Sequence, residues 1–485
     1  MITDLAAAGR SITRDCDLLI LGAGPAGITT ALELARKAPG LDIVLAEAGG
    51  FEPSTPAELD LYDGPSTGSS PYAISTARLR GFGGSSGHWG GWCRPFDEVD
   101  FLPRAAAGVP GWPIERDTLN PHYVAAHGWL EIPSHDYDPG NLSAALKRRL
   151  IDLDASPWFR NRLFRFSPPT RFATRYRADI EATANIDCRL NAAAIAWGVS
   201  GDAIETVTLG GLHDYTLTVR PRRVVIAMGG IESTRHLLLL RQQGFGAAGL
   251  HGGFLGRGFA DHFGYRPGIV HLPAERIYQR IDDDSGDVMP VISPTPEALE
   301  RTGWNNSCIM LDVIADGPEL PRSYASNQLF GLSSSESWSY RVTMILEPRV
   351  NEDSRLELAD ERDALGLPRT HIAWEIDPRA YDSAAATFER FAQELGRLGL
   401  GRARIDPRYH EIWRKRVTPV YHHMGTLRMA KDAGHGVVDT DLKLFGGANL
   451  YVASSAVFPS FGYSNPTLTI VALAHRLAAH LRDLA

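Results

Sequence analysis

The sequence predicts an α/β fold in which a nucleotide-binding unit with a parallel sheet is interrupted by a second unit with a mostly antiparallel sheet. Three observations lead to this prediction. A GAGPAG segment stands between an apolar run and a helical pattern near the amino terminus. Alternating stretches at residues 340–346 and 355–358 mark the middle of the chain and are typical of antiparallel strands. The length of 485 residues exceeds the size at which one core keeps growing, so we expect two associated units.

The amino-terminal segment predicts one βαβ unit. The order of strand, glycine turn, helix and strand falls on residues 17–21, 22–27, 28–37 and 41–46. Gly22, Gly24 and Gly27 have the GxGxxG spacing of a dinucleotide-binding turn. The first glycine permits the tight turn, the second lets a pyrophosphate approach the backbone, and the third lets helix and strand pack closely. The helix amino terminus then offers free N–H groups and a partial positive charge to the phosphates.

Glu47 ends the second predicted strand, about twenty residues beyond the last glycine of the turn. A carboxylate at this place accepts hydrogen bonds from an adenosine ribose and disfavours a 2′-phosphate. Turn, helix start and acid together predict a Rossmann-like nucleotide domain. They do not separate FAD from NAD, so an NAD enzyme stays open as a weaker alternative at this point.

Two later segments extend the predicted nucleotide domain. An apolar run at residues 223–228 leads into Gly229 and a helix over residues 231–240. Residues 467–484 form an apolar helical pattern that follows Asn465 and Pro466. Because proline is favoured at the first helical position and asparagine just before it, Asn465 is a candidate helix cap.

Composition excludes several classes of protein. The apolar content of 44% and charged content of 22% are those of an ordinary globular chain. The net charge of -8, with both signs interspersed, disfavours binding to nucleic acid or to an anionic membrane. The four cysteines lack metal-ligand spacing and are expected to be free thiols, and no metal site is expected. Neither a signal segment nor a membrane-spanning run is found, so we expect a soluble cytoplasmic protein; its oligomeric state stays open.

Three weaker patterns have structural interpretations. Arginine and aromatic residues interleave over residues 159–177, a pattern that also occurs in single-stranded nucleic-acid binding; the acidic surroundings favour a loop packed on the nucleotide domain, with some arginines paired. The DDDSG run at residues 282–286 lacks the ligand spacing of a calcium loop and predicts a solvated turn. No GxSxG elbow is present, so serine hydrolysis is not supported.

Four further motifs make the chain resemble the glucose-methanol-choline (GMC) family of FAD oxidoreductases over nearly its whole length. They are GFGGSSGHWGG at residues 81–91, the strand, turn and helix start at 223–235, GRGFADH at 256–262, and the carboxyl-terminal pair HHMGTLRM and SNPT at 422–429 and 464–467. The form of the GGSSGHWGGW loop, the HxxGTxRM pattern and the Asn before Pro466 are most similar to bacterial pyranose oxidases and glycoside 3-oxidase-like sugar oxidoreductases.

The resemblance implies the GMC fold, a Rossmann-like FAD-binding domain with an inserted α+β substrate domain on a mostly antiparallel sheet. We expect the discontinuous FAD-binding domain to comprise residues 1–100, 186–264 and 432–485. Residues 101–185 and 265–431 are then the substrate-binding domain with its flavin-covering loops.

The resemblance also assigns the catalytic residues. Oxidation of an alcohol needs a base for the hydroxyl proton, and imidazole suits neutral pH. The catalytic histidine of the family stands four residues before the Thr of GT, which here selects His422, since Thr426 follows at that spacing. His423 would point elsewhere in an extended segment. Asn465 corresponds to the residue that hydrogen-bonds the substrate oxygen as negative charge develops, so this residue has two candidate roles.

Asp261 and His262 are adjacent and could be mistaken for a catalytic dyad. In the family pattern this pair lies beyond the glycine turn. We therefore expect a structural role for both residues.

The family pattern implies flavin contacts along the whole chain. The predicted FAD-binding residues are Gly22, Gly24, Pro25, Ala26, Gly27, Glu47, Ala48, Gly83, Gly84, Ser85, His88, Trp89, Ala227, Gly229, Ser455, Asn465, Pro466 and Thr467. Pyranose oxidases attach FAD through the histidine of a His-Trp pair, and His88 occupies that place. Ser-Gly precedes His88 where those enzymes have Thr, so covalent and non-covalent contact both stay open.

The implied reaction is FAD-dependent oxidation of a secondary ring hydroxyl of a sugar or glycoside to a keto-sugar. His422 takes the proton, flavin N5 takes the hydride, and oxygen or another acceptor reoxidises the flavin. One alternative is oxidation of a primary alcohol on a polyol or aminoglycoside. Another, from a different class, is a flavin-containing hydroxynitrile-type lyase, because the family includes such enzymes.

Overall fold

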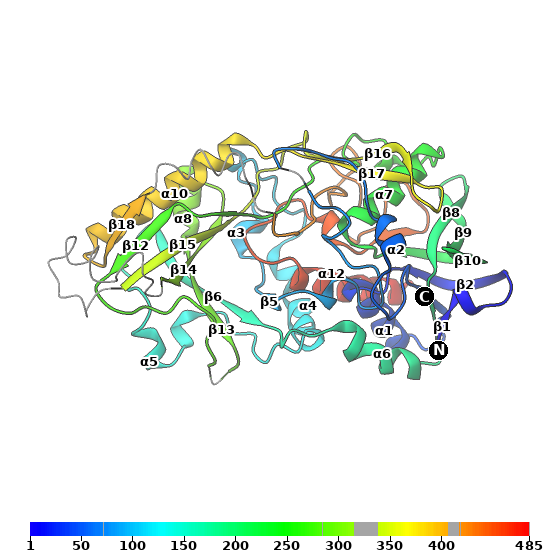
Figure 1. The fold of residues 1–485 in the computed structure, drawn as a ribbon, viewed down its shortest axis with the longest axis horizontal. Coiled ribbons are helices and arrows are strands. Elements are labelled where there is room, and N and C mark those ends of the chain that lie inside the picture. The colour runs from blue at the N-terminus through cyan, green and yellow to red at the C-terminus, as the bar shows by residue number, and fades with distance from the viewer. Residues whose placement is uncertain (71, 284, 315–337, 406–416, 418, 485) are drawn as a thin grey trace.

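Two large sheets stand at opposite ends of the molecule, and helices join them (Figure 1). The computed structural model describes residues 1–70, 72–283, 285–314, 338–405, 417 and 419–484. Asp284, one residue of the acidic run, lies outside the described residues. The predicted α/β class is confirmed, with a parallel sheet and an antiparallel sheet in one chain.

The first sheet is the predicted nucleotide-binding sheet. Its order is β1 (Ile2–Asp4), β7 (Ile186–Leu190), β3 (Ile43–Ala46), β2 (Ile12–Leu21), β10 (His213–Ile226), β9 (Ala203–Gly211) and β8 (Ala193–Ser200), with β19 (Leu450–Val452) on β10. The pairs from β1 to β10 are parallel, whereas β10, β9 and β8 are antiparallel. Strands from both ends of the chain thus meet in one sheet.

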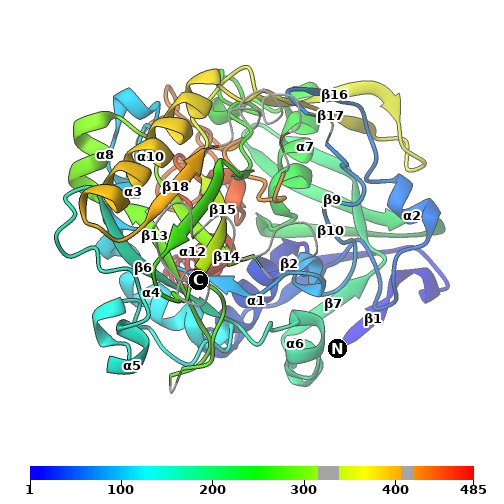
Figure 2. The ribbon, with the colours of Figure 1, turned by 60° about the vertical axis from the view of Figure 1, so that its left-hand side comes forward.

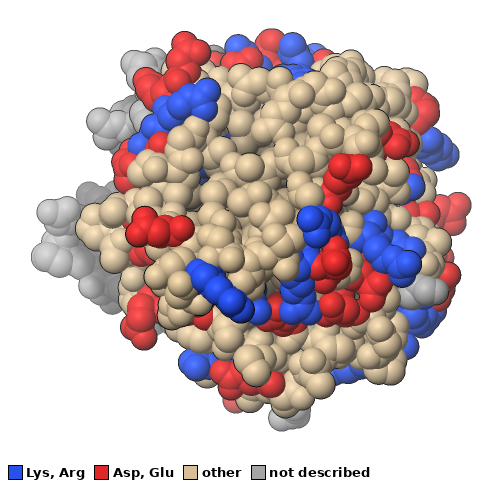
Figure 3. Space-filling model, turned by 90° about the vertical axis from the view of Figure 1, so that its right-hand side faces the viewer, with Lys and Arg blue, Asp and Glu red and all other residues tan. Residues whose placement is uncertain are grey.

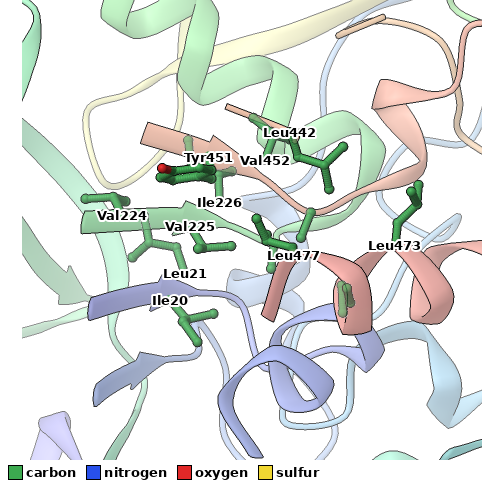
Figure 4. Packing of buried hydrophobic residues seen from close by; sticks show 14 of the residues in the cluster. Ile20, Leu21, Val224, Val225, Ile226, Leu442, Tyr451, Val452, Leu473 and Leu477 are labelled. Atoms are coloured by element: carbon green, nitrogen blue, oxygen red, sulfur yellow. The ribbon is translucent and has the colours of Figure 1, made fainter. Parts of the chain in front are cut away.

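Helices cover the parallel part of this sheet. They are α1 (Pro25–Lys37), α6 (Phe172–Ala182), α7 (Gly229–Gln242) and α12 (Thr467–Asp483), with α4 (Arg116–Trp129) packed on α12. Figure 4 shows Leu477 of α12 beside Val225 and Leu21 of the sheet, with Leu473 further along the helix. All four side chains are buried. This apolar layer fixes the carboxyl-terminal helix against the amino-terminal βαβ unit, because burial of such side chains is worth about 1.5–3 kcal/mol each.

The second sheet is antiparallel, as the alternating stretches predict. Its order is β18 (Arg402–Ile405), β12 (Gly268–Leu272), β15 (Trp338–Leu346), β14 (Ser307–Val313), β13 (Val288–Pro294), β6 (Phe159–Phe166) and β5 (Trp92–Cys93), with β11 (Phe263–Tyr265) on β15. The long helix α10 (Pro378–Arg397) lies over it with α8 (Pro296–Thr302) beside it (Figure 2).

Smaller elements connect these layers. A third sheet contains β16 (Arg355–Arg362), β17 (Pro368–Trp374) and β4 (Ser66–Gly68), and the short helices are α2 (Pro56–Asp60), α3 (Glu98–Phe101) and α5 (Ala144–Lys147). The division into an FAD-binding and a substrate-binding domain at the predicted boundaries stays a prediction.

The loop expected over residues 159–177 is wrong. The segment is β6 followed by α6. Phe164 and Phe166, two residues apart, share one buried face of the strand, and Phe172 and Tyr176, four apart, share one buried face of the helix. Its arginines all have polar partners. Arg160 and Arg162 contact Asp97, Arg165 contacts Ser285, Arg171 contacts the carbonyls of Ser86 and Trp89, Arg175 contacts Glu131, and Arg177 contacts Glu181. The expectation that some of these arginines are paired is confirmed.

The thiols and the surface agree with the composition. Cys16, Cys93, Cys188 and Cys308 are free and buried, as predicted. Figure 3 shows acidic and basic side chains next to each other on the face that carries the edge of the first sheet. Among the described helices, none has the length and apolar character needed to cross a bilayer.

Candidate active site

A cavity of about 820 Å³ runs between the two sheets and gathers most of the predicted site residues. Of the predicted set, it is lined by Gly22, Gly24, Pro25, Ala26, Glu47, Ala48, Gly84, Ser85, His88, Trp89, Ala227, Gly229, His422, Ser455, Asn465, Pro466 and Thr467. Gly27 and Gly83 do not line it. The cavity therefore joins the glycine turn to the two residues assigned to catalysis.

The glycines of the turn leave space where a phosphate has to approach. A Cβ at Gly22, whose φ is +102°, would lie 2.5 Å from the Ala227 carbonyl oxygen, and a Cβ at Gly27 would lie 1.9 Å from the Gly22 carbonyl oxygen. Gly24 differs, because its Cβ would meet only the Gly84 Cα, at 3.9 Å. Gly22 and Gly27 are thus required for packing, whereas Gly24 keeps the cavity open.

The start of α1 has polar groups suited to a diphosphate. Gly24 is the N-cap of α1, and glycine has no side chain that could cap the helix. The backbone amides of the first turn are therefore not bound by a capping side chain. Glu47 lies beside them, where it accepts hydrogen bonds from the Ala23 amide at 2.8 Å and the Gly49 amide at 3.0 Å. Burial raises the pKa of Glu47. These residues fit an adenosine diphosphate group.

A buried ion-pair network that the motifs did not predict also contributes to the lining. Glu232 of α7 contacts Arg78 at 2.9 Å and Arg235 at 3.0 Å, and Arg235 contacts Asp363 at 2.6 Å. Burial opposes the charge of Glu232, but Arg235 and Arg78 together lower its pKa to about 2. No local pattern could have revealed this network, because its members come from three separate segments.

His422 and Asn465 meet inside the cavity. The Asn465 Nδ2 atom lies 3.2 Å from His422 Nε2. Pro466, not Asn465, is the N-cap of α12, and no side chain caps that helix. The helix-cap interpretation of Asn465 is therefore wrong, because its side chain turns towards the imidazole instead of the first helical amides.

The backbone of His422 is held in an unusual turn. Tyr421 has a φ of +63°, a conformation that non-glycine residues rarely adopt. The Asp261 carboxylate accepts hydrogen bonds from the Tyr421 amide at 2.9 Å, the His422 amide at 2.8 Å and the Tyr72 hydroxyl at 2.7 Å. Successive amides of such a turn form a concave site for an anion. Burial raises the pKa of Asp261 to about 7, although these donors oppose the rise.

The two adjacent histidines have different surroundings. Burial, with His262 and His423 nearby, holds the pKa of His422 well below its usual range, so its imidazole is a neutral base. The His423 ring contacts Tyr72 and Phe259 instead of Asn465, and its buried Nε2 atom has no partner. His423 is itself one of the residues that line the cavity.

The wall contributed by the second sheet is apolar. Trp92 of β5, Phe164 of β6, Met310 of β14 and Ile345 of β15 line the cavity together with Tyr463. Apart from Trp92, which ends the GGSSGHWGGW loop, sequence motifs did not single out these strand residues, because alternation along a strand shows which face is buried but not which cavity it meets.

His88 occupies an exposed position in the cavity lining, next to the short helix at residues 84–87. Partial burial and the nearby Arg171 lower its pKa. The neighbouring Trp89 is anchored, since its Nε1 donates to the Thr170 carbonyl at 3.0 Å.

Comparisons with known proteins show which proteins the chain is similar to. Residues 350–474 match the family model described as GMC oxidoreductase. The fructose dehydrogenase large subunit of Gluconobacter japonicus is 24% identical over 97% of this chain and 99% of its own length. The C-glycoside 3-oxidase of Microbacterium trichothecenolyticum is 34% identical over 25% of this chain and 22% of its own length. The crystal structure of pyridoxine 4-oxidase from Mesorbium loti superposes with a TM-score of 0.60 at 18% identity, over 96% of this chain and 99% of that one.

Fold, cavity and comparisons define a flavin-dependent oxidoreductase that acts on CH–OH groups. Residues 350–474 are a GMC oxidoreductase carboxyl-terminal domain, and the chain as a whole is similar to GMC oxidoreductases. FAD is its cofactor, and the open Gly24 turn, the uncapped α1 start and the unpartnered His423 nitrogen all fit a bound dinucleotide.

Proposed function

We propose that the enzyme oxidises a secondary ring hydroxyl of a neutral sugar or glycoside to a ketone. The observation that carries the proposal is the contact of His422 with Asn465 in a cavity whose second-sheet wall is apolar. Aromatic side chains such as Trp92 suit the apolar faces of a pyranose ring or of an aglycone. The similarity to C-glycoside 3-oxidase supports the same choice.

The side chains have distinct tasks in this reaction. Neutral His422 accepts the hydroxyl proton at Nε2, and the Asn465 amide donates a hydrogen bond to the substrate oxygen as it becomes negative. The largely apolar surroundings strengthen both interactions. When bound, FAD supplies the hydride acceptor at N5, and oxygen or another acceptor reoxidises it.

The charges of the cavity favour a neutral substrate over an aminoglycoside. Among the described lining residues the carboxylates are Glu47, Glu232 and Asp363. Backbone amides bind the first, and arginines bind the other two. No carboxylate of the described lining is thus left to pair with a substrate ammonium group, as an amino sugar would require.

Anaerobic mixing of the purified enzyme with a panel of alcohols tests the proposal. Neutral glycosides should bleach the flavin absorbance, and analysis of the product should show a ring ketone. Faster bleaching by an aminoglycoside or a polyol, with an aldehyde as product, would favour the primary-alcohol alternative. Turnover of a cyanohydrin with the flavin still yellow would identify a lyase. Later admission of air shows whether oxygen is an acceptor.

His88 is also a candidate for covalent attachment of FAD, because it is exposed in the cavity at the place where related oxidases carry that bond. Denaturation in acid tests this assignment. Yellow colour that stays with the precipitate indicates a bond, which His88→Ala should abolish. Colour found entirely in the supernatant shows that FAD is bound without one.

A further inference from the structure

His262 contacts the His422 ring on the side opposite to Asn465. The two Nδ1 atoms lie 2.8 Å apart, and the rings meet edge to face at an interplanar angle of 89°. The His262 side chain is fully buried. One nitrogen of His422 therefore faces Asn465 and the cavity, and the other faces a second imidazole.

A backbone carbonyl determines how the protons are arranged along this chain of contacts. His262 Nε2 lies 2.8 Å from the Gly462 carbonyl oxygen, which can only accept. The proton of neutral His262 is therefore on Nε2, and its Nδ1 is an acceptor. His422 must then donate from Nδ1, which leaves the lone pair of its Nε2 free towards the Asn465 amide.

The Gly462 carbonyl is itself held in place. The Gly462 amide donates to the buried Glu347 carboxylate at 3.1 Å, and Glu347 contacts Arg104 at 2.6 Å. A Cβ at Gly462, whose φ is +51°, would lie 2.6 Å from an Asp100 carboxylate oxygen, so glycine is required there. The acceptor for His262 thus rests on a rigid, buried support.

We propose that His262 is a positioning residue that keeps His422 in the Nδ1–H tautomer and shares the proton gained during alcohol oxidation. Its neighbour Asp261 fixes the His422 backbone, so the pair holds the base by both main chain and side chain. The inference rests on the proposed function only in taking His422 as the base.

The proton balance is simple. His422 Nε2 takes the proton from the substrate hydroxyl, while the hydride leaves the carbon for the flavin. His422 is then an imidazolium whose Nδ1–H points at the lone pair of His262 Nδ1. The Nδ1–H···Nδ1 hydrogen bond strengthens once its donor is charged. His262 neither gains nor loses electrons.

Two matched variants separate the two contacts of His262. In His262→Asn the side-chain oxygen overlays Nδ1, so it keeps an acceptor for His422 but loses the Gly462 contact. In His262→Gln the amide nitrogen overlays Nε2, so it keeps the Gly462 contact but loses the acceptor. We expect His262→Gln to slow flavin reduction about 10²-fold at saturating substrate, and His262→Asn to stay within about tenfold of the parent, both with unchanged FAD content.

The tautomer is observed directly by nitrogen NMR of the ¹⁵N-histidine-labelled holoenzyme without substrate, with the His422 signal assigned by its loss in His422→Gln. The parent and His262→Asn should show the Nδ1–H form, and His262→Gln should shift towards the Nε2–H form. An Nε2–H form in the parent, or equal rate losses in both variants, would overturn the proposal. If no alcohol reduces the flavin, the proposed function fails, whereas the tautomer comparison still decides this inference.

Discussion

The two ends of the cavity are formed by groups of different chemistry. The nucleotide end has a glycine turn, the amino terminus of α1, the buried Glu47 and an ion-pair network around Glu232. The redox end has neutral histidines, an amide and an apolar wall. Fixed charges and helix dipoles suit a ligand that is always anionic. A reaction that moves a proton instead needs bases whose charge changes easily.

This difference explains why the histidines are neutral. Burial lowers the pKa of His262 to about 4 and that of His423 to about 3, and the pKa of His422 is lowered well below its usual value. Each imidazole is therefore a lone-pair acceptor at neutral pH, so that the charge appears only while the proton is transferred.

Loss of the base should give the largest effect. His422→Ala should slow flavin reduction about 10²–10⁴-fold without loss of FAD, because His422 Nε2 is the proposed base that faces the Asn465 amide. Stopped-flow absorbance measures the rate. His435→Ala is a matched control on the surface, since that side chain is 78% exposed, and it should match the parent. A rate for His422→Ala within a few-fold of the parent would refute the assignment.

Loss of the Asn465 side-chain amide should give the second largest effect on the rate. Asn465→Ala should reduce the same rate about 10²–10³-fold, as removal of an oxyanion donor does. Because Asn465 caps no helix, the melting temperature should change little. A large drop in melting temperature with an unchanged rate would show that the residue is structural.

A substitution at the nucleotide end should change the amount of bound FAD instead of the rate of flavin reduction. Gly22→Ala places a Cβ 2.5 Å from the Ala227 carbonyl at a φ of +102°, so the turn must distort and the purified protein should lose most of its FAD. Gly40→Ala is the control, because a Cβ there meets nothing within 4 Å. Flavin absorbance relative to protein measures occupancy, and full occupancy of Gly22→Ala would contradict the role of the turn.

The pH dependence should give the smallest effect. A lowered pKa of His422 keeps the base unprotonated at neutral pH, so the rate should be constant above the ordinary histidine pKa of 6.5 and fall only in more acidic solution. The rate of flavin reduction, measured from about pH 5 to about pH 9, covers the range in which a histidine titrates. It tests whether the rate falls only in acidic solution. A midpoint at or above the ordinary histidine pKa would show that a different group controls the rate.

How far the sequence predicts the site depends on the separation of its parts. The GxGxxG turn, α1 and Glu47 lie within one local segment, and their spacing predicts both structure and ligand class. His422 was selected by its distance from Thr426, which is also local. The Asn465 ambiguity was different, because a cap and a substrate contact have the same sequence pattern, and only the direction of the side chain separates them.

Tertiary structure decided the remaining parts because they depend on contacts between distant residues. Asp261 and His262 are 160 residues from the segment that they hold, and the apolar wall comes from four strands. The sequence by itself determined the α/β class and the nucleotide turn, and its resemblance to the GMC family led to the proposal of His422 as the base. Only the folded chain decided which nitrogen of His422 is free, because that depends on the Gly462 carbonyl, and backbone groups far apart in sequence meet only when the core is packed.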